Sequence, residues 1–126
     1  LQDTYNVVTV MNRTRSNYWM VVNAHEGDDA YVKVDFISLK KAAMILRALN
    51  HKLRQQIVRV LDEHKRLTVT ELYIHLRLEQ SVASQHLAIL RRAGIVKTER
   101  DGKFIHYTIN PDRIADIMKT VQLLIV

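Results

Sequence analysis

The chain has 126 residues, 48% of them hydrophobic, and a formal net charge of +6 at pH 7, a combination that excludes a disordered protein and suits one compact domain. It contains no cysteine, which excludes disulfides, thiolate metal sites and thiol redox chemistry. Because it has neither an apolar run of about 18 residues nor a secretion signal, we predict a cytoplasmic protein with no membrane partner.

The charge is unevenly distributed along the chain. Residues 38–126 contain sixteen Lys/Arg and eight Asp/Glu, whereas residues 1–37 contain three and five. A basic segment of this kind favours a polyanionic partner such as nucleic acid. The alternative is a basic protein whose charge only keeps it soluble.

Residues 1–37 are predicted to form an N-terminal extension that holds short strands or is partly disordered. Its candidate strands are rich in Val, Tyr and Trp: Tyr5–Val10, Tyr18–Val22 and Tyr31–Val34. Met11 is a candidate natural start of the chain.

From residue 38 onwards the apolar residues recur at helical spacing. Ser38 is a candidate N-cap for the first helix. The expected core face of this helix is apolar: Leu39, Ala42, Ala43, Leu46 and Leu49. A second helix is predicted from about His51 to Lys65. Its expected buried residues are Leu53, Ile57, Val58 and Leu61.

The next two helices are predicted to form a helix-turn-helix. Thr68, with Glu71 three residues later, has the pattern of a capping box at the start of the third helix. The fourth helix runs from about Gln80 to Ala93 and ends before Gly94, a residue suited to the position after a helix end. Its expected core-facing residues are Ala83, Leu87 and Leu90.

A hairpin and a last helix complete the predicted fold. The strands Val96–Arg100 and Phe104–Ile109 flank Asp101-Gly102, a dipeptide typical of a type I′ turn. Pro111 suits the first turn of a helix that continues to the C-terminus. We therefore predict a mainly α fold with a small β-hairpin wing, a winged helix-turn-helix over residues 38–126.

The outward face of the fourth helix is predicted to contact DNA. It carries small, amide and basic side chains: Ser81, Ser84, Gln85, Ala88 and Arg92. Gln85 can form two hydrogen bonds with adenine, and the free amides near Gln80 and Ser81 suit a phosphate. Arg91 and Arg92 suit the DNA backbone better than the bases. The alternative is an ordinary solvated polar face.

The hairpin tip is a second candidate contact. Arg100 and Lys103, together with Lys97, lie around the predicted turn. In a winged module such residues reach phosphates or the neighbouring minor groove. A cationic hairpin tip that serves only solubility is the alternative.

The segment LRLEQSVASQHLAILRRAGIVKTERDGKFIHYTIN resembles the ArsR/SmtB family of winged-helix repressors, whose pattern is Ser-Gln-Ser-Thr-Val-Ser-x-His-Leu-x-x-Leu-x-x-Ala-Gly-Leu-Val followed by a Gly-containing wing. The matching residues are Gln80, Ser81, Ser84, His86, Leu87, Leu90, Ala93, Gly94, Val96, Gly102 and Tyr107. Upstream, the second helix is similar through Leu49, Arg54, Ile57 and Leu61.

The resemblance implies a dimeric DNA-binding repressor that an effector commonly releases from its operator. By position, the family's DNA-reading residues are Gln80, Ser81, Val82, Ser84 and Gln85. Two positions depart from the pattern, because Glu79 replaces a capping Ser and Val82 replaces a Thr. His86 directly precedes the core Leu87, so packing or a local hydrogen bond competes with a role in base contacts.

No metal and no cofactor is predicted. Metal-sensing members of the family often carry Glu-Leu-Cys-Val-Cys-Asp-Leu on the third helix, and here Tyr73 and His75 occupy the thiolate positions. The last helix holds Asp112 and Asp116 but no histidine to complete a site. We assign His75 to the surface or to packing, and the acidic group His25, Glu26, Asp28 and Asp29 to a solvated turn.

Dimerisation is predicted through the N- and C-terminal helices of residues 38–126. The candidate interface residues are Leu39, Leu46, Ile114, Ile117, Met118, Val121 and Leu124. Such an apolar surface exceeds what one small module needs to fold. The alternative is that the last helix packs onto the core of its own chain.

The sequence thus predicts a DNA-binding transcriptional regulator that is not an enzyme. We expect a sequence-specific repressor that acts as a homodimer on double-stranded operator DNA, with an effector that is not a metal or is unknown. The alternatives are a winged-helix module that binds another protein and an architectural DNA-binding protein of weak specificity. Binding to DNA fragments across a salt series separates these three.

Overall fold

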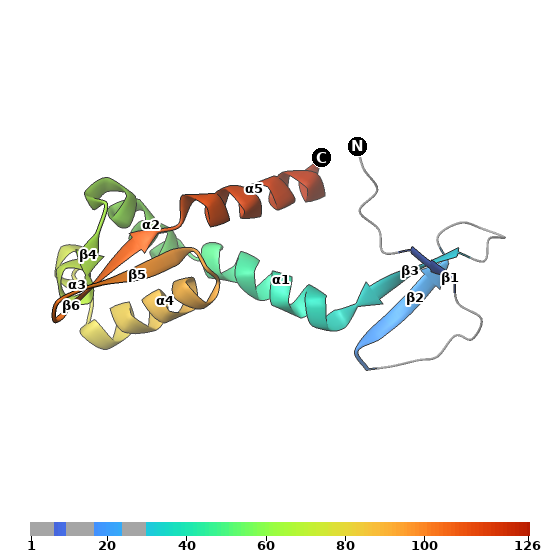
Figure 1. The fold of residues 1–126 in the computed structure, drawn as a ribbon, viewed down its shortest axis with the longest axis horizontal. Helices are drawn as coiled ribbons and strands as arrows, with labels where there is room; N and C mark the ends of the chain where they lie inside the picture. Colours follow the sequence, from blue (N-terminus) through green and yellow to red (C-terminus); the bar gives the residue numbers. More distant parts are fainter. Residues whose placement is uncertain (1–6, 10–16, 24–29) are drawn as a thin grey trace. The chain divides into compact units, whose positions relative to one another are not determined.

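The fold is mainly helical with a small wing, as predicted (Figure 1). The computed structural model describes residues 7–9, 17–23 and 30–126. In chain order the elements are β1 (Val7–Thr9), β2 (Trp19–Asn23), β3 (Ala30–Asp35), α1 (Phe36–Leu49), α2 (Lys52–His64), β4 (Leu67–Thr68), α3 (Val69–Leu76), α4 (Gln80–Arg92), β5 (Val96–Asp101), β6 (Phe104–Ile109) and α5 (Pro111–Ile125).

The chain divides into two units, residues 1–43 and 44–126, with the division inside α1. The boundary predicted from sequence, between residues 37 and 38, lies near the start of the same helix and stays a prediction. Each unit is described by itself.

The first unit contains a three-stranded antiparallel sheet in the order β1-β3-β2. Its strands fall within or overlap the three predicted segments, and residues 5, 6 and 10 of the first segment lie outside the described part. Tyr31 on the central strand is buried, and Lys33 Nζ lies 5.3 Å from the centroid of the Trp19 ring. A cation over an aromatic face is a stabilising contact across the β2–β3 pair.

Helix α1 begins three residues earlier than the predicted N-cap at Ser38 implies. The Asp35 Oδ1 atom accepts hydrogen bonds from the amides of Ile37 (3.0 Å) and Ser38 (3.1 Å), and Oδ2 accepts one from the Ser38 hydroxyl (3.0 Å). These bonds, the backbone bond from Ser38 first, hold the pKa of the Asp35 carboxyl below its usual value. Asp35 therefore caps the helix, and the prediction of Ser38 as N-cap was wrong.

The core of the second unit lies where α2, α3 and α4 meet the short sheet and α5. The largest completely buried side chains in it are Ile57, Leu61, Leu72, Leu87, Leu90, Ile95 and Val96. Of the second helix's predicted core residues, Ile57 and Leu61 are buried, whereas Leu53 and Val58 are half-buried. Val60 and Arg54 take the remaining inward positions on α2.

The sheet of this unit has three strands in the order β4-β6-β5, and β4 was not predicted. In the hairpin, Asp101 pairs with Phe104, so the two turn residues are Gly102 and Lys103. Gly102 has a φ of 61° and Lys103 is absent from the residues of positive φ. This is the pattern of a type II′ turn, and the predicted type I′ turn on Asp101-Gly102 was wrong.

The helix-turn-helix begins and ends with the predicted signals. Thr68 Oγ1 accepts from the Glu71 amide (3.2 Å) while Glu71 Oε1 accepts from the Thr68 amide (2.9 Å), which completes the capping box of α3. After α4, Gly94 has a φ of 77°, and the amides of Gly94 and Ile95 donate to the carbonyls of Arg91 and Leu90. This Schellman motif requires a left-handed residue at position 94, so Gly94 ends α4 as expected.

No helix in the described ranges is long and apolar enough to cross a membrane.

Replacing Thr68 with Ala is expected to lower the free energy of unfolding by about 1 kcal/mol, because the α3 amide of Glu71 loses its side-chain acceptor. Thr70→Ala on the same helix is the matched control, since Thr70 is exposed and takes no part in the capping box. Urea denaturation of both variants measures the difference. Equal losses in the two variants would contradict the role of the cap.

Candidate nucleic-acid interface

Helix α4 buries one stripe and exposes the opposite one, as its sequence predicted. Ala83, Leu87 and Leu90 are completely buried in the core. The exposed residues are Ser81, Ser84, Gln85, Ala88 and Arg92. Because the side chain of Ala88 is only a methyl group and the two serines are small, this face lets a partner approach the helix backbone closely. The contact of these residues with DNA stays a prediction.

The N-terminus of α4 presents free amides. The first helical hydrogen bond runs from the Ala83 amide to the Glu79 carbonyl (3.1 Å), so the amides of residues 80–82 precede the helical ladder. Gln80 is exposed and Val82 is half-buried. Glu79 occupies the N-cap position without a side-chain capping bond, and its carboxylate lies beside the place where a phosphate would bind.

The wing carries the two predicted cations at its tip. Arg100 Nε donates to the Gly102 carbonyl (3.2 Å), and Lys103 Nζ lies 5.5 Å from the centroid of the Phe104 ring. Both cations are exposed. Phe104 and Ile105 are exposed as well, an apolar feature of the wing that sequence reasoning did not identify.

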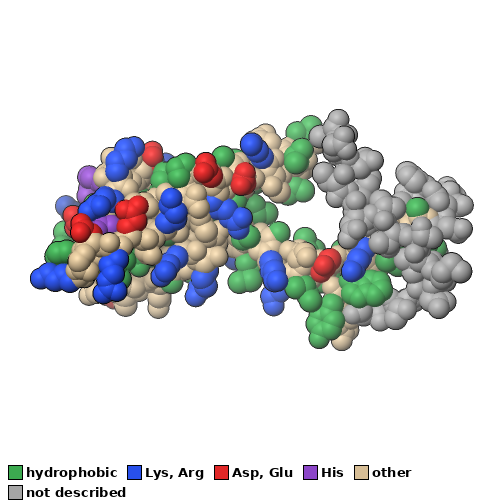
Figure 2. Space-filling view, in the orientation of Figure 1, with side chains coloured by type: hydrophobic (Ala, Val, Ile, Leu, Met, Phe, Trp, Pro, Cys, Tyr) green, Lys and Arg blue, Asp and Glu red, His purple; other side chains and the backbone are tan. Residues whose placement is uncertain are grey.

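A hollow between α4 and β6 brings parts of the predicted face together. It is lined by Ser84, Ala88, Arg91, Arg92 and Tyr107. Two arginines therefore border the outward face of α4, and Figure 2 shows Lys and Arg side chains spread over the visible face of the second unit. The sequence placed Arg91 and Arg92 at the helix end, and the structure puts them beside Ser84.

Beside this face lies a contact between Arg54 of α2 and His86 of α4 that the sequence did not predict. Arg54, only 6% exposed, has Nη1 3.2 Å from Nδ1 of His86, and the rings of His86 and His51 lie 5.0 Å apart. Burial, followed by the charges of His51 and Arg54, lowers the pKa of His86 below its usual value. His86 thus makes the packing and hydrogen-bond contacts that are the alternative to contact with bases. The signal for Arg54 was its position on the same helix face as Ile57 and Leu61.

The C-terminal end of α4 is held by a second arginine. Arg113 of α5 donates from Nε to the Ala93 carbonyl at 3.0 Å. A Cβ atom on Gly94 would lie 3.2 Å from this Nε atom, so the glycine also leaves room for the arginine. Arg54 therefore holds the middle of α4 through His86 and Arg113 holds its C-terminal end, while its outward face is exposed.

The predicted dimerisation residues differ in burial. Ile117 is 6% exposed and belongs to the core of its own chain, and Leu46, Ile114 and Val121 pack against that core while half-buried. Leu39, Met118 and Leu124 are exposed. Leu123, which is 58% exposed, adds to the apolar surface of α5.

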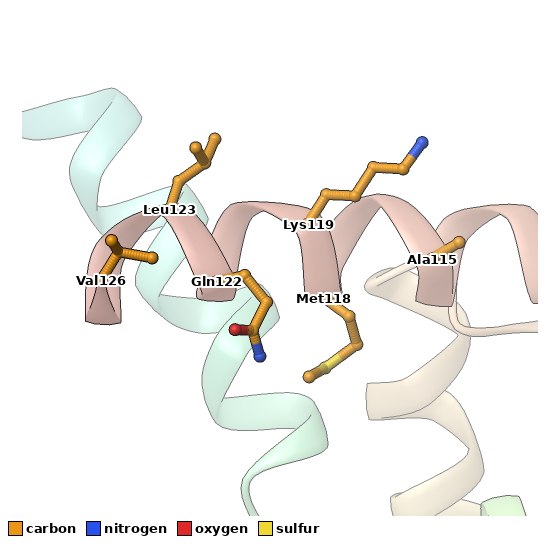
Figure 3. A pocket seen from close by; sticks show the side chains of 6 residues that line it. All are labelled: Ala115, Met118, Lys119, Gln122, Leu123 and Val126. Carbon is orange, nitrogen blue, oxygen red and sulfur yellow. The ribbon is translucent and has the colours of Figure 1, made fainter. Parts of the chain in front are cut away.

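A groove along α5 is almost wholly apolar (Figure 3). It is lined by Ala115, Met118, Lys119, Gln122, Leu123 and Val126. Figure 3 shows Ala115, Lys119 and Leu123 along one edge of the helix and Met118 and Gln122 along the other. An exposed apolar strip of this kind is typical of a protein–protein contact.

The described part of the chain contains no group of three or more His, Cys, Asp or Glu side chains that could hold a metal ion. His75 is exposed, with its ring 4.8 Å from that of His64. Asp112 and Asp116 are exposed on α5. The acidic group of residues 25–29 lies outside the described residues.

Much of the second unit is similar in sequence to known proteins. A family model described as "Bacterial regulatory protein, arsR family" matches residues 51–98, from the cap of α2 to β5. The transcriptional repressor PagR of Bacillus anthracis is 38% identical over 90 residues, which are 71% of this chain and 90% of that protein. The transcriptional activator HlyU of Vibrio cholerae is 36% identical over 84 residues, 67% of this chain and 77% of that protein.

Solved structures have a similar fold. The crystal structure of PagR superposes with a TM-score of 0.55 at 37% identity and covers 69% of this chain and 99% of that one. The solution structure of the homodimeric winged helix-turn-helix DNA-binding domain Mb0332 of Mycobacterium bovis gives a TM-score of 0.58 at 25% identity, over 70% of this chain and 81% of that one.

Replacing Glu79 with Ser is expected to raise the free energy of unfolding by an amount on the order of 1 kcal/mol, because a hydroxyl at the N-cap of α4 accepts from the first free amides. Glu63→Ser, which removes the same charge from an exposed position inside α2, is the control and should give no gain. Thermal and urea denaturation of both variants test this. A gain in both would assign the effect to net charge instead of capping.

Proposed function

This chain belongs to the ArsR family of bacterial regulatory proteins, and from this premise we propose that it is a cytoplasmic homodimeric repressor that binds operator DNA. The observation that carries the proposal is the exposed stripe of α4, opposite a stripe that is completely buried. A helix held in this way by its own core presents a fixed row of side chains to a groove of DNA. The family consists of regulatory proteins and is not an enzyme family.

Recognition of bases takes place in the major groove. Gln85 donates and accepts a pair of hydrogen bonds with adenine, and the hydroxyls of Ser81 and Ser84 reach neighbouring base edges or phosphates. Val82, where the family pattern has Thr, suits the methyl group of thymine. Ala88 allows the helix to enter deeply.

Contacts with phosphates set the register of the protein on the duplex. Arg91 and Arg92 border the α4 face, and Arg100 and Lys103 extend from the wing towards the adjacent backbone or minor groove. Because such contacts release counterions, each cation lost should lower the salt dependence of binding by about one unit. Gln80 and the free amides of α4 add a phosphate contact.

The dimer brings two α4 helices into successive major grooves. Exposed Leu39, Met118 and Leu124, together with Leu123, form the apolar surfaces that a second copy covers. The similar winged helix-turn-helix domain Mb0332 of Mycobacterium bovis is homodimeric, which supports this arrangement. Half-sites about one DNA turn apart follow from the two-fold symmetry. A dimer bound there blocks a promoter by occupancy alone, which is why we propose repression although HlyU is named an activator.

The rivals predict different behaviour towards DNA. A winged module that binds another protein leaves genomic DNA fragments unbound even at low salt. An architectural protein binds all fragments with similar affinity. The proposed repressor enriches one sequence from a library of random duplexes, and this enrichment is the first test of the function.

Replacing Gln85 with Ala is expected to cost about 1–3 kcal/mol of binding free energy towards the enriched duplex and to relax the preference at one base pair. The control is Gln56→Ala, an exposed glutamine on α2. Fluorescence anisotropy with the enriched duplex and its single-base variants measures both effects. Unchanged affinity and preference in Gln85→Ala would disprove the assignment of the recognition face.

Replacing Leu123 with Glu is expected to shift the chain from dimer to monomer in sedimentation experiments, because a carboxylate in the α5 groove is desolvated by a second copy. Ile74→Glu is the matched control, since Ile74 is an equally exposed apolar residue, but on α3. The control should sediment like the wild type. A monomeric wild type, or a Leu123→Glu variant that stays dimeric, would refute the proposed interface.

A further inference from the structure

We propose that Arg54 and His86 form a positioning node for α4, and that DNA sequence discrimination fails when the His86 ring takes a proton. This inference rests on the proposed function, because it concerns how the reading helix is held. Neither residue belongs to the exposed face of α4.

The node begins at the C-terminus of α1, where four carbonyls lack helical partners. Each of these carbonyls accepts a hydrogen bond from a residue that follows α1. The Asn50 amide donates to Leu46 (2.8 Å), Arg54 Nη2 to Arg47 (3.0 Å), Arg54 Nε to Ala48 (2.7 Å) and Gln55 Nε2 to Leu49 (3.1 Å). The start of α2 is therefore locked onto the end of α1 by the Arg54 guanidinium.

The guanidinium is buried without an acidic partner. The ion pairs found among the described residues are Lys65–Asp62 and Arg66–Asp101, and neither involves Arg54. Its charge is instead compensated by the carbonyls at the negative end of the α1 dipole. A buried cation held in this way has little freedom to move, so its third nitrogen points to a fixed place.

That place is the His86 ring on α4. Arginine has only donors, so at 3.2 Å from Nη1 the Nδ1 atom of His86 must accept, and the neutral ring carries its proton on Nε2. His86 lies between the exposed Gln85 and the completely buried Leu87. The bond therefore fixes the rotation of α4 at the residue next to the base-contacting amide.

Protonation of His86 puts an N–H donor and a positive charge against Arg54. The lowered pKa of His86 follows from its burial and from the nearby His51 and Arg54. The neutral, bonded state is therefore complete above the ordinary value of 6.5, and it is lost as the pH falls through the lowered pKa. Acidification therefore breaks the hydrogen bond between Arg54 and His86.

The groups that face His86 are few. From α2 and its cap these are Arg54 and His51, whose own Nδ1 accepts from the amides of Leu53 (3.1 Å) and Arg54 (3.4 Å). From α3 and β5, which also pack against α4, no described side chain forms an ion pair or hydrogen bond with the His86 ring. No carboxylate is therefore available to stabilise the protonated ring.

The test compares the affinity for the duplex enriched by this chain with that for a scrambled duplex, at pH 7.5 and at a lower pH at which nitrogen NMR shows the His86 ring to be protonated. For the full-length wild type, the ratio of the two affinities should fall about tenfold on acidification, the scale of losing one charge-assisted hydrogen bond. Affinity for the scrambled duplex, which is held by phosphate contacts alone, should not show this fall. The difference between the two duplexes separates positioning from general electrostatics.

Four variants locate the effect. His86→Asn keeps an acceptor at the Nδ1 position that does not titrate, so its ratio should stay constant between the two pH values. His75→Asn, the matched control on α3, and His51→Asn, which keeps an N-cap acceptor, should both retain the wild-type fall. Arg54→Lys, which cannot span two carbonyls and the ring, should already show a lowered ratio at pH 7.5.

A pH-dependent ratio that persists in His86→Asn, or one that vanishes in His51→Asn instead, would overturn the proposal while leaving DNA recognition intact. Loss of the enriched duplex by the wild type at pH 7.5 would instead overturn the proposed function and this inference with it. Nitrogen NMR of the wild-type His86 ring is an independent check. The expected form at pH 7.5 is the Nε2–H tautomer, and an Nδ1–H tautomer would contradict the node even if a variant fails to fold.

Discussion

The arrangement of the helices depends on the hydrogen bonds of the buried Arg54 guanidinium. It satisfies two carbonyls at the end of α1 and contacts His86 on α4, so one side chain ties three helices together. An acid in place of the carbonyls would have given a salt bridge with a single partner. Because backbone carbonyls take this place, the compensation of the buried charge depends on how α1 ends. At the far end of α4, Arg113 repeats the device by donating to Ala93, so α5 also limits the movement of α4.

This construction explains the division of labour along α4. Its Ala83, Leu87 and Leu90 side chains are completely buried, arginines hold it at His86 and at Ala93, and its outward side chains are exposed. The surface left for DNA is therefore small, polar and fixed in direction, while apolar residues that the core does not use are concentrated on α5. The proposed function needs both properties, a rigid reading surface and a separate surface for a second copy.

Local signals made much of this predictable. The Thr68–Glu71 capping box, the Ala83–Leu87–Leu90 stripe and the Gly94 stop each depend on residues a few positions apart, and each is observed. The cap at Asp35 was also readable, since Asp35 and Ser38 have capping spacing, but the apolar Phe36 and Ile37 obscured it. The hydrogen-bond partners of Arg54 and the β4–β6 pairing were not readable, because each depends on a partner more than five residues away or on another element.

The most direct test of the account is chemical footprinting of the full-length protein on its enriched duplex, with one probe of guanine N7 in the major groove and one of adenine N3 in the minor groove. The account predicts two patches of major-groove protection related by two-fold symmetry, with centres about 10 base pairs apart. Minor-groove protection should appear only at the flanks, where the wings lie. A single protected patch, or protection confined to the minor groove, would contradict recognition by paired α4 helices.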